Sequence, residues 1–136
     1  MTNLATNQDY LGGQNDFTMQ CPATFDIGAA VESAPVVVRE KCRCRGAILS
    51  LITDTTGEAD ITLFKNGAIT VPVILRSVPT ATGPATGENG FYVNFESDTD
   101  DAGGGVRFDV GDRVSLSSDG VGAAAVTTVV FIMRTD

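Results

Sequence analysis

Apolar residues in most of the chain come in short runs in which hydrophobic and polar positions alternate. From Thr24 onward these runs are rich in Val, Ile, Thr and Phe, and Gly, Asp, Asn or Pro separate them. Such alternation is typical of β-strands, and no segment carries the i, i+3, i+4, i+7 apolar stripe of a long helix. The predicted strands span residues 25–31, 35–44, 47–53, 59–65, 68–75, 91–96, 106–110, 113–117 and 123–134.

The spacing of these strands predicts the architecture. About eight strands, with turns roughly every 8–12 residues, predict an all-β fold of two packed antiparallel sheets. A jelly roll is the preferred form of this β-sandwich, and an immunoglobulin-like sandwich is the alternative. We expect the sandwich to cover residues 23–136. Residues 1–22 are polar, contain no Lys or Arg and show no strand or helix period, which predicts a flexible N-terminal arm.

Two short sequences predict turns, and the alternation predicts which side chains face the core. Asn66-Gly67 stands between two apolar runs and predicts a type I′ hairpin, because both residues tolerate a positive φ. Gly111-Asp112 is expected to separate two strands in the same way. Residues 129–133 are apolar on both faces, which predicts a strand that is central or covered on both sides. The side chains predicted to face inward are Phe91, Val93, Phe95, Val106, Phe108, Val110, Val114 and Leu116.

Composition and charge exclude several classes of function. The chain contains no His, which excludes Ser-His-Asp and Cys-His catalysis and any His-ligated metal. No Gly-rich phosphate loop, nucleophile elbow or metal-ligand spacing is present, so we expect neither an enzyme nor a cofactor. The net charge of -8 argues against nucleic acid and anionic membranes as partners. Because no signal peptide and no apolar run of about 18 residues is found, we expect no membrane span.

Cysteines and carboxylates offer two further candidate sites. Cys21, Cys42 and Cys44 are odd in number and follow no secretion signal, which predicts free thiols in the core. Glu96, Asp98, Asp100 and Asp101 form an acidic cluster before three glycines, and residues 98–103 resemble the start of a Ca²⁺-binding EF-hand loop. Ala102 occupies the fifth position of such a loop, counted from Asp98, and no helix flanks the loop, so a solvated acidic loop is preferred. Residues 77–90 predict a protruding contact loop, with a tolerated surface insertion as the alternative.

A basic stripe is the most patterned polar feature of the chain. A period of two places Arg39, Lys41, Arg43 and Arg45 on one face, and Glu40, Cys42 and Cys44 on the other. The stripe either docks on an acidic partner or a phosphate backbone, or pairs with acidic neighbours across the sheet and guards an edge. The second interpretation is preferred. Together with apolar residues of the arm, the candidate partner-binding residues are Tyr10, Leu11, Phe17, Arg39, Lys41, Arg43 and Arg45.

The assembled pattern resembles a known family. The C-terminal half reads FDVGDRVSLSSDG and ends AAAVTTVVFIMRTD, behind a polar arm and without catalytic residues. Over residues 24–136 this resembles the jelly-roll head decoration, or cement, proteins of tailed bacteriophages. The resemblance implies a structural virion protein, assembled in the host bacterial cytoplasm and bound to the capsid surface. Its partners would be the major capsid protein and neighbouring copies of itself, with dimer and trimer both open.

Other functions stay open beside this resemblance. The Gly111-Asp112-Arg113 turn and the terminal strand also resemble tumour-necrosis-factor-like jelly rolls, including phage fibre heads. A receptor- or carbohydrate-binding module of a fibre is therefore the main alternative, and it predicts a stable trimer. The absence of Trp and the presence of only 2 Tyr argue against a sugar site. A Ca²⁺-dependent adhesion module comes third, and nucleic-acid binding through the basic stripe comes fourth.

Overall fold

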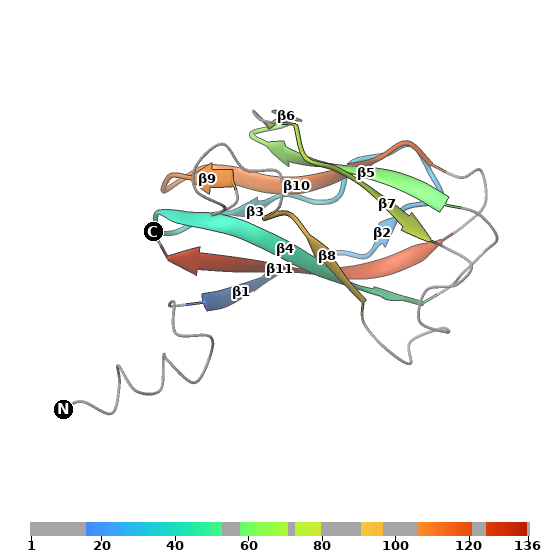
Figure 1. The fold of residues 1–136 in the computed structure, drawn as a ribbon, viewed down its shortest axis with the longest axis horizontal. Coiled ribbons are helices and arrows are strands. Elements are labelled where there is room, and N and C mark those ends of the chain that lie inside the picture. The colour runs from blue at the N-terminus through green and yellow to red at the C-terminus, as the bar shows by residue number, and fades with distance from the viewer. Residues whose placement is uncertain are drawn as a thin grey trace, which may run out of the picture.

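The computed structural model describes residues 16–52, 58–70, 73–79, 91–96, 106–120 and 125–135. Within these ranges the chain forms eleven strands and no helix, so the prediction of an all-β fold is confirmed (Figure 1). The strands are β1 (Asp16–Gln20), β2 (Phe25–Asp26), β3 (Val36–Val37), β4 (Cys42–Leu51), β5 (Glu58–Lys65), β6 (Ala68–Ile69), β7 (Leu75–Pro79), β8 (Phe91–Asn94), β9 (Val106–Phe108), β10 (Arg113–Ser118) and β11 (Val126–Thr135).

The strands form two antiparallel sheets that pack face to face (Figure 1). In the first, sheet A, β1 and β2 lie along one edge, followed by β11, β4 and then β8 and β9 at the other edge. In the second, sheet B, the order is β3, β10, β5 and then β6 and β7. The strand predicted to be central, β11, does lie between β1 and β4.

The pairing of early strands with late strands defines a jelly roll. β2 pairs with β11 and β3 with β10, while β4 pairs with β8 and β9, and β5 with β6 and β7. The chain is thus a long antiparallel ribbon whose successive pairs fold alternately into the two sheets. The preferred architecture is therefore correct, and the immunoglobulin-like alternative is not adopted.

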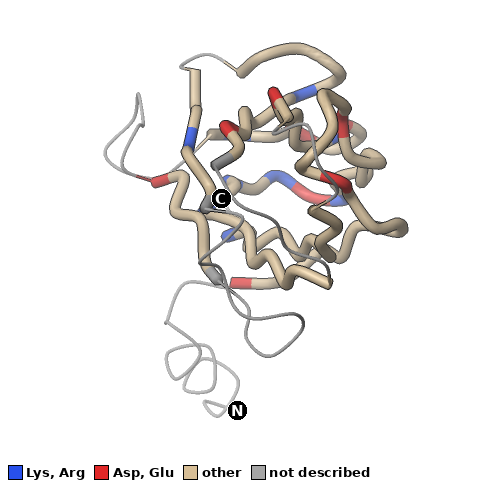
Figure 2. Tube along the Cα trace, turned by 90° about the vertical axis from the view of Figure 1, so that its right-hand side faces the viewer, with Lys and Arg blue, Asp and Glu red and all other residues tan. Residues whose placement is uncertain are grey.

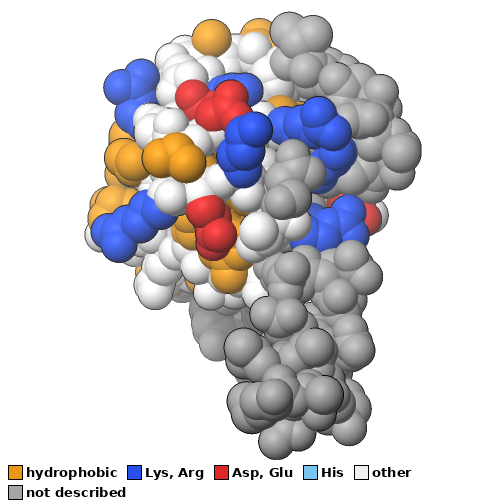
Figure 3. Space-filling view, turned by 90° about the vertical axis from the view of Figure 1, so that its left-hand side faces the viewer, with side chains coloured by type: hydrophobic (Ala, Val, Ile, Leu, Met, Phe, Trp, Pro, Cys, Tyr) orange, Lys and Arg blue, Asp and Glu red, His pale blue; other side chains and the backbone are white. Residues whose placement is uncertain are grey.

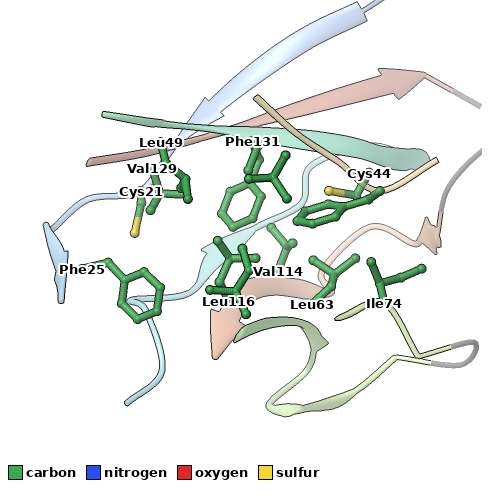
Figure 4. Close-up of a cluster of buried hydrophobic side chains, with 14 of the residues drawn as sticks. Cys21, Phe25, Cys44, Leu49, Leu63, Ile74, Val114, Leu116, Val129 and Phe131 are labelled. Atoms are coloured by element: carbon green, nitrogen blue, oxygen red, sulfur yellow. The ribbon is translucent and has the colours of Figure 1, made fainter. Parts of the chain in front are cut away.

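The core lies between the inner faces of the two sheets. Phe131 and Leu49 point into it from sheet A, and Leu63, Val114 and Leu116 meet them from sheet B (Figure 4). Among the residues predicted to face inward, six are buried, so alternation located most of the core correctly. These six are Val93, Phe95, Val106, Phe108, Val114 and Leu116.

Val110 corrects that prediction. We expected it to follow Val106 and Phe108 into the core, yet 66% of its surface is exposed. The reason is that β9 ends at Phe108 and the backbone turns at residues 110–111, where the chain leaves sheet A for sheet B. The side chain of Phe91, predicted to face inward, lies outside the described part of the structure.

The boundary of the predicted N-terminal arm is also wrong. Asp16–Gln20 forms β1, which pairs with β11 over its whole length. Phe17 and Met19 pack against the core, so a short alternating segment gains enough contact to join the sheet. Residues 1–15 of the predicted arm lie outside the described residues.

Several predicted strands are shorter than expected. Residues 25–31 supply only β2, and the predicted strand over 35–44 is divided between β3 in sheet B and the start of β4 in sheet A. The predicted strand over 68–75 contains β6 and only the first residue of β7. The point at which the chain passes from one sheet to the other cannot be located from the sequence when the residues on both sides of it are apolar.

The two predicted turns have different outcomes. Asn66 and Gly67 have φ values of 56° and 79° and connect β5 to β6, as a type I′ hairpin requires. Gly111 also has a positive φ, of 91°, but the strands on either side belong to different sheets. The Gly111-Asp112 turn is therefore a crossover between sheets rather than a hairpin.

The three cysteines are free and buried, as predicted for core thiols. Burial raises the pKa of the Cys44 thiol, and the neighbouring Cys42 raises it further. A raised pKa leaves almost no thiolate at neutral pH, and the thiolate is the reactive form.

We therefore expect the folded protein to resist thiol reagents. Ellman's reagent at pH 7.5 should react very slowly with the native chain, and with three thiols once guanidinium chloride unfolds it. Absorbance of the released chromophore measures both. Rapid reaction of the native chain would contradict the burial of Cys42 and Cys44.

Candidate docking surface

Arg45 occupies a β-bulge in β4. Ile132 of β11 lies opposite Gly46, but the next residue, Met133, lies opposite Cys44, so Arg45 has no partner position on β11. The bulge shifts the alternation by one residue, and both Cys44 and Ala47 can therefore point into the core. Arg45 itself projects from the outer face of sheet A.

The guanidinium of Arg45 joins three strands. Its Nη1 donates to Asp16 of β1 and its Nε donates to Glu96, which follows β8 closely in the chain. The hydrogen bond to Glu96 raises the pKa of Arg45, and the charge of Asp16 adds to it. Tyr92 donates its hydroxyl to the carbonyl oxygen of Arg45 at 3.2 Å, and burial raises the pKa of that phenol. The structural interpretation of the basic stripe is therefore correct at Arg45.

Three arginines lie side by side on the outer face of sheet A. Arg43 of β4 is directly opposite Arg134 of β11 on one side and Arg107 of β9 on the other. Arg43 and Arg107 each already have an interaction within the protein, so neither is a free cation waiting for a docking partner. Like charges directly opposite each other in a sheet destabilise it, which makes the alignment unusual in a chain of net charge -8.

Most of the basic residues lie at one end of the sandwich. β4 and β10 begin there and β5, β9 and β11 end there, and Figure 3 shows the Lys and Arg side chains gathered on this face. The Nζ of Lys65 donates to the carbonyl oxygen of Arg107 at 3.0 Å and so links the two sheets. We call this face the basic end. It contains seven of the nine Lys and Arg: Arg39, Lys41, Arg43, Lys65, Arg107, Arg113 and Arg134.

The opposite end of the sandwich is acidic in the described residues. Asp26 lies in β2, and Asp60 and Asp119 are joined there by a backbone hydrogen bond of 3.0 Å. The two remaining basic residues, Arg45 and Arg76, lie within β4 and β7. Figure 2 shows the two layers end-on with both kinds of charge marked along the trace. The basic residues are therefore gathered at one end of the strands, while the described acidic residues occur at both ends.

Two apolar side chains are exposed within the basic end. Val37 is 53% exposed and lies opposite Arg113, while Val110 is 66% exposed on the turn that follows β9. Two backbone hydrogen bonds of 2.8 Å hold that turn against Val38: Gly111 donates to the Val38 carbonyl, and Val38 donates to the Asp112 carbonyl. Val37 and Val110 are thus placed on neighbouring backbone segments.

A groove of about 580 Å³ runs beside the basic end. It lies between β1, at the edge of sheet A, and the segment from β3 to β4 at the edge of sheet B. Edge strands offer unpaired backbone groups to a partner. The groove brings together Phe17 and Arg39, two of the predicted partner-binding residues. Its lining residues are Phe17, Thr18, Met19, Gln20, Pro22, Pro35, Val36, Val37, Arg39 and Glu40.

The other predicted contact residues have separate outcomes. Lys41 is exposed and Arg43 lies on the outer face of sheet A, but Tyr10 and Leu11 lie outside the described residues. The stripe is not one continuous strand face, because residues 40–41 form a bend before β4 begins. Arg107 and Arg134 were missed as members of the basic surface. The signal that Arg107 faces outward was its place between the apolar residues Val106 and Phe108, and for Arg134 it was the apolar Met133 before it.

The remaining candidate sites are only partly covered by the structure. Glu96 is engaged by Arg45, and residues 97–105 lie outside the described part of the acidic loop. Of the predicted contact loop, residues 77–79 belong to β7 and residues 80–90 are not described. Among the described residues, no group of three His, Cys, Asp or Glu could hold a metal ion. No helix in that part of the chain is long and apolar enough to cross a membrane.

Asp112 fastens the turn at the basic end. Its carboxylate accepts hydrogen bonds from the Asn66 side chain at 3.0 Å and from the backbone N–H of Asp109 at 2.7 Å. These hydrogen bonds, followed by the charge of Lys65 at 3.6 Å, lower the pKa of Asp112. A lowered pKa stabilises the fold above the ordinary aspartate value, and this contribution is lost as the pH falls through the folded value.

We therefore expect Asp112→Asn to remove part of the pH dependence of stability. The variant should unfold more easily than the wild type at pH 7, and the difference should shrink below about pH 4, where the unfolded carboxyl also takes up a proton. Urea unfolding followed by circular dichroism at several pH values measures this. An equal difference at pH 7 and pH 2.5 would show that the charge of Asp112 is not responsible.

The described surface carries groups that are suited to binding a partner. Guanidinium groups recognise carboxylates, the exposed valines supply apolar contact area, and the groove gives access to two sheet edges. Comparison with known proteins adds no relative: no family model, no curated protein and no solved structure matches the chain.

Proposed function

We propose that this protein is a structural decoration, or cement, protein of a tailed phage, which binds the outside of the head and joins neighbouring major capsid subunits. The observation that carries the proposal is a jelly roll with seven of its nine basic residues and two exposed valines at one end, beside an open groove. A rigid sandwich with one adhesive end is suited to standing on a shell. Copies of the protein could also touch one another through their sides.

The physical basis of such a function is preferential binding. A protein that binds only the assembled, expanded shell stabilises that state by mass action. Many copies with modest individual affinity add up when each bridges two subunits. The chain enters β1 at Asp16, beside Arg45, so the preceding residues, including Tyr10 and Leu11, are joined to the molecule next to the basic end. In this proposal they add contact area on the shell.

The test uses heads of the phage that encodes the chain, prepared without its gene. Purified protein should co-sediment with expanded heads to a saturable copy number, and should raise the temperature at which the heads release DNA, measured with a fluorescent dye. Unassembled capsid subunits are the control and should bind far less. Failure to bind expanded heads would contradict the proposal. A stable trimer that bound host cells or glycans would support a fibre module instead.

A further inference from the structure

We propose that the basic end is the docking face and that its partner is a carboxylate-rich protein surface. The inference deepens the proposed function by naming the chemistry of the partner, and it relies on that function only for the identity of the shell. It implies that the sandwich stands with its strands pointing at the partner, so that the face shown in Figure 3 meets the partner and the acidic end faces away.

Charge complementarity is the first argument. Seven of nine basic residues occupy one end of a protein whose net charge is -8, and Arg39, Lys41 and Arg113 are exposed there. Segregated charge orients a protein as it approaches an oppositely charged surface and raises the association rate. An acidic partner surface would therefore attract the basic end and repel the opposite end.

The exposed valines are the second argument. Val110 is the most exposed of the large apolar side chains in the described structure. Val37 lies on the segment next to it, since Val38 forms backbone hydrogen bonds with Gly111 and Asp112. Protein interfaces combine a small apolar centre with arginines. The same combination occurs here, since Arg113 lies opposite Val37 and Arg39 is two residues along the chain.

The same features disfavour a nucleic acid at this face. Val37 and Val110 would find no apolar surface on a phosphate backbone. Glu40 and Asp109 are exposed among the arginines, where they would repel phosphates. A duplex is also stiff, so it cannot bend away from these carboxylates or from the acidic remainder of the molecule, as a flexible polypeptide can. A protein surface can instead present carboxylates only where they are needed.

The experiment compares two variants that change the net charge equally. Arg39→Ala with Lys41→Ala removes two exposed cations from the basic end, just before β4. Ala23→Glu with Thr24→Glu adds two charges at exposed positions before β2, away from the basic end. Wild type and both variants are titrated against expanded heads, poly-L-glutamate and duplex DNA at low and moderate salt. Val110→Ser, at an exposed position, tests the apolar contact on heads.

We expect the first variant to bind heads and poly-L-glutamate at least about tenfold more weakly than the wild type, with a shallower salt dependence. The control variant should stay within about twofold at moderate salt, because its added charges precede β2, which pairs with the start of β11, whereas the basic end lies where β11 ends. Val110→Ser should weaken binding to heads without changing the salt dependence. Melting curves of each variant show whether it is folded.

Four outcomes would overturn the inference. They are unchanged binding by the first variant, equal weakening by the control variant, a preference of the wild type for duplex DNA, and head-to-tail self-association of the chain through its two ends. One further result would contradict the proposed function but not the inference about the acidic partner. If the wild type ignored heads but bound poly-L-glutamate through Arg39 and Lys41, the cement function would fail and the acidic partner would stand.

Discussion

Replacing Gly46 with alanine is expected to destabilise the protein by about 3 kcal/mol, because the new methyl group has no room. A Cβ at this position would lie 2.4 Å from the carbonyl oxygen of Val93 and 2.5 Å from the hydroxyl oxygen of Tyr92. The Val93 oxygen belongs to the backbone of β8, which pairs with β4 here, so it cannot move without disturbing the sheet. Urea unfolding followed by circular dichroism measures the loss.

Two further variants separate crowding from backbone strain. Gly67→Ala places a methyl group in open space at a φ of 79°, so it should cost only about 1–2 kcal/mol, from strain alone. Combining Gly46→Ala with Tyr92→Ala removes the ring but not the Val93 carbonyl, so it should relieve part of the clash. The losses of unfolding free energy in Gly46→Ala alone and Tyr92→Ala alone would then sum to more than the loss in the double variant. A Gly46→Ala protein as stable as the wild type would contradict the close packing of Tyr92 over β4.

The sandwich could be predicted because its strongest signals are local. Alternation identified Val93, Phe95, Val114 and Leu116 as core residues, and a type I′ turn depends on Asn66 and Gly67 alone. Each of these inferences uses residues that are close together in the chain. These inferences therefore hold regardless of which distant strands pair with each other.

The errors arise where distant contacts decide the structure. Asp16–Gln20 becomes a strand only because β11, over 100 residues later, offers it an edge. Val110 leaves the core because Gly111 and Asp112 bond to Val38 on another segment, which pulls the turn across to sheet B. Neither partner is visible in the local pattern of hydrophobic and polar residues.

The candidate docking surface depends on register in the same way. Period two identified Arg43 as outward-facing, but only the pairing of β4 with β9 and β11 places Arg107 and Arg134 beside it. The bulge at Arg45 could be inferred from neighbouring residues, because Cys44 and Ala47 are both apolar and are three positions apart. A period of two cannot bury both without an extra residue between them.

The two interpretations of the basic stripe therefore apply to different residues. Arg45 is held by carboxylates across the sheet, and its role in the fold is structural. Arg39 and Lys41 precede β4 and are exposed, so docking on an acidic partner stays a prediction for them. The pairing of β4 with its neighbours, which brings Asp16 and Glu96 to Arg45, separates its role from that of Arg39 and Lys41.

Arg45→Met is expected to cost about 2–3 kcal/mol of stability, between the values typical of exposed and of buried ion pairs. Methionine retains much of the aliphatic length but leaves two carboxylates without their shared cation. The side chains of Asp16 and Glu96 are only 18% and 26% exposed, so water cannot fully replace the guanidinium. Loss of this tie should also loosen β1, because Asp16 is its first residue.

Replacing Arg45, Asp16 and Glu96 together with uncharged residues distinguishes the loss of their ion pairs from the cost of leaving two carboxylates unpaired. Adding Asp16→Asn and Glu96→Gln to Arg45→Met removes both carboxylates that the single variant leaves unpaired. The triple variant should therefore be more stable than Arg45→Met alone, although it contains more substitutions. Denaturant midpoints of the two proteins, measured with the wild type at equal pH and salt, make the comparison. If the triple variant were the less stable, the carboxylates would be stabilising β1 and β8 through contacts other than Arg45.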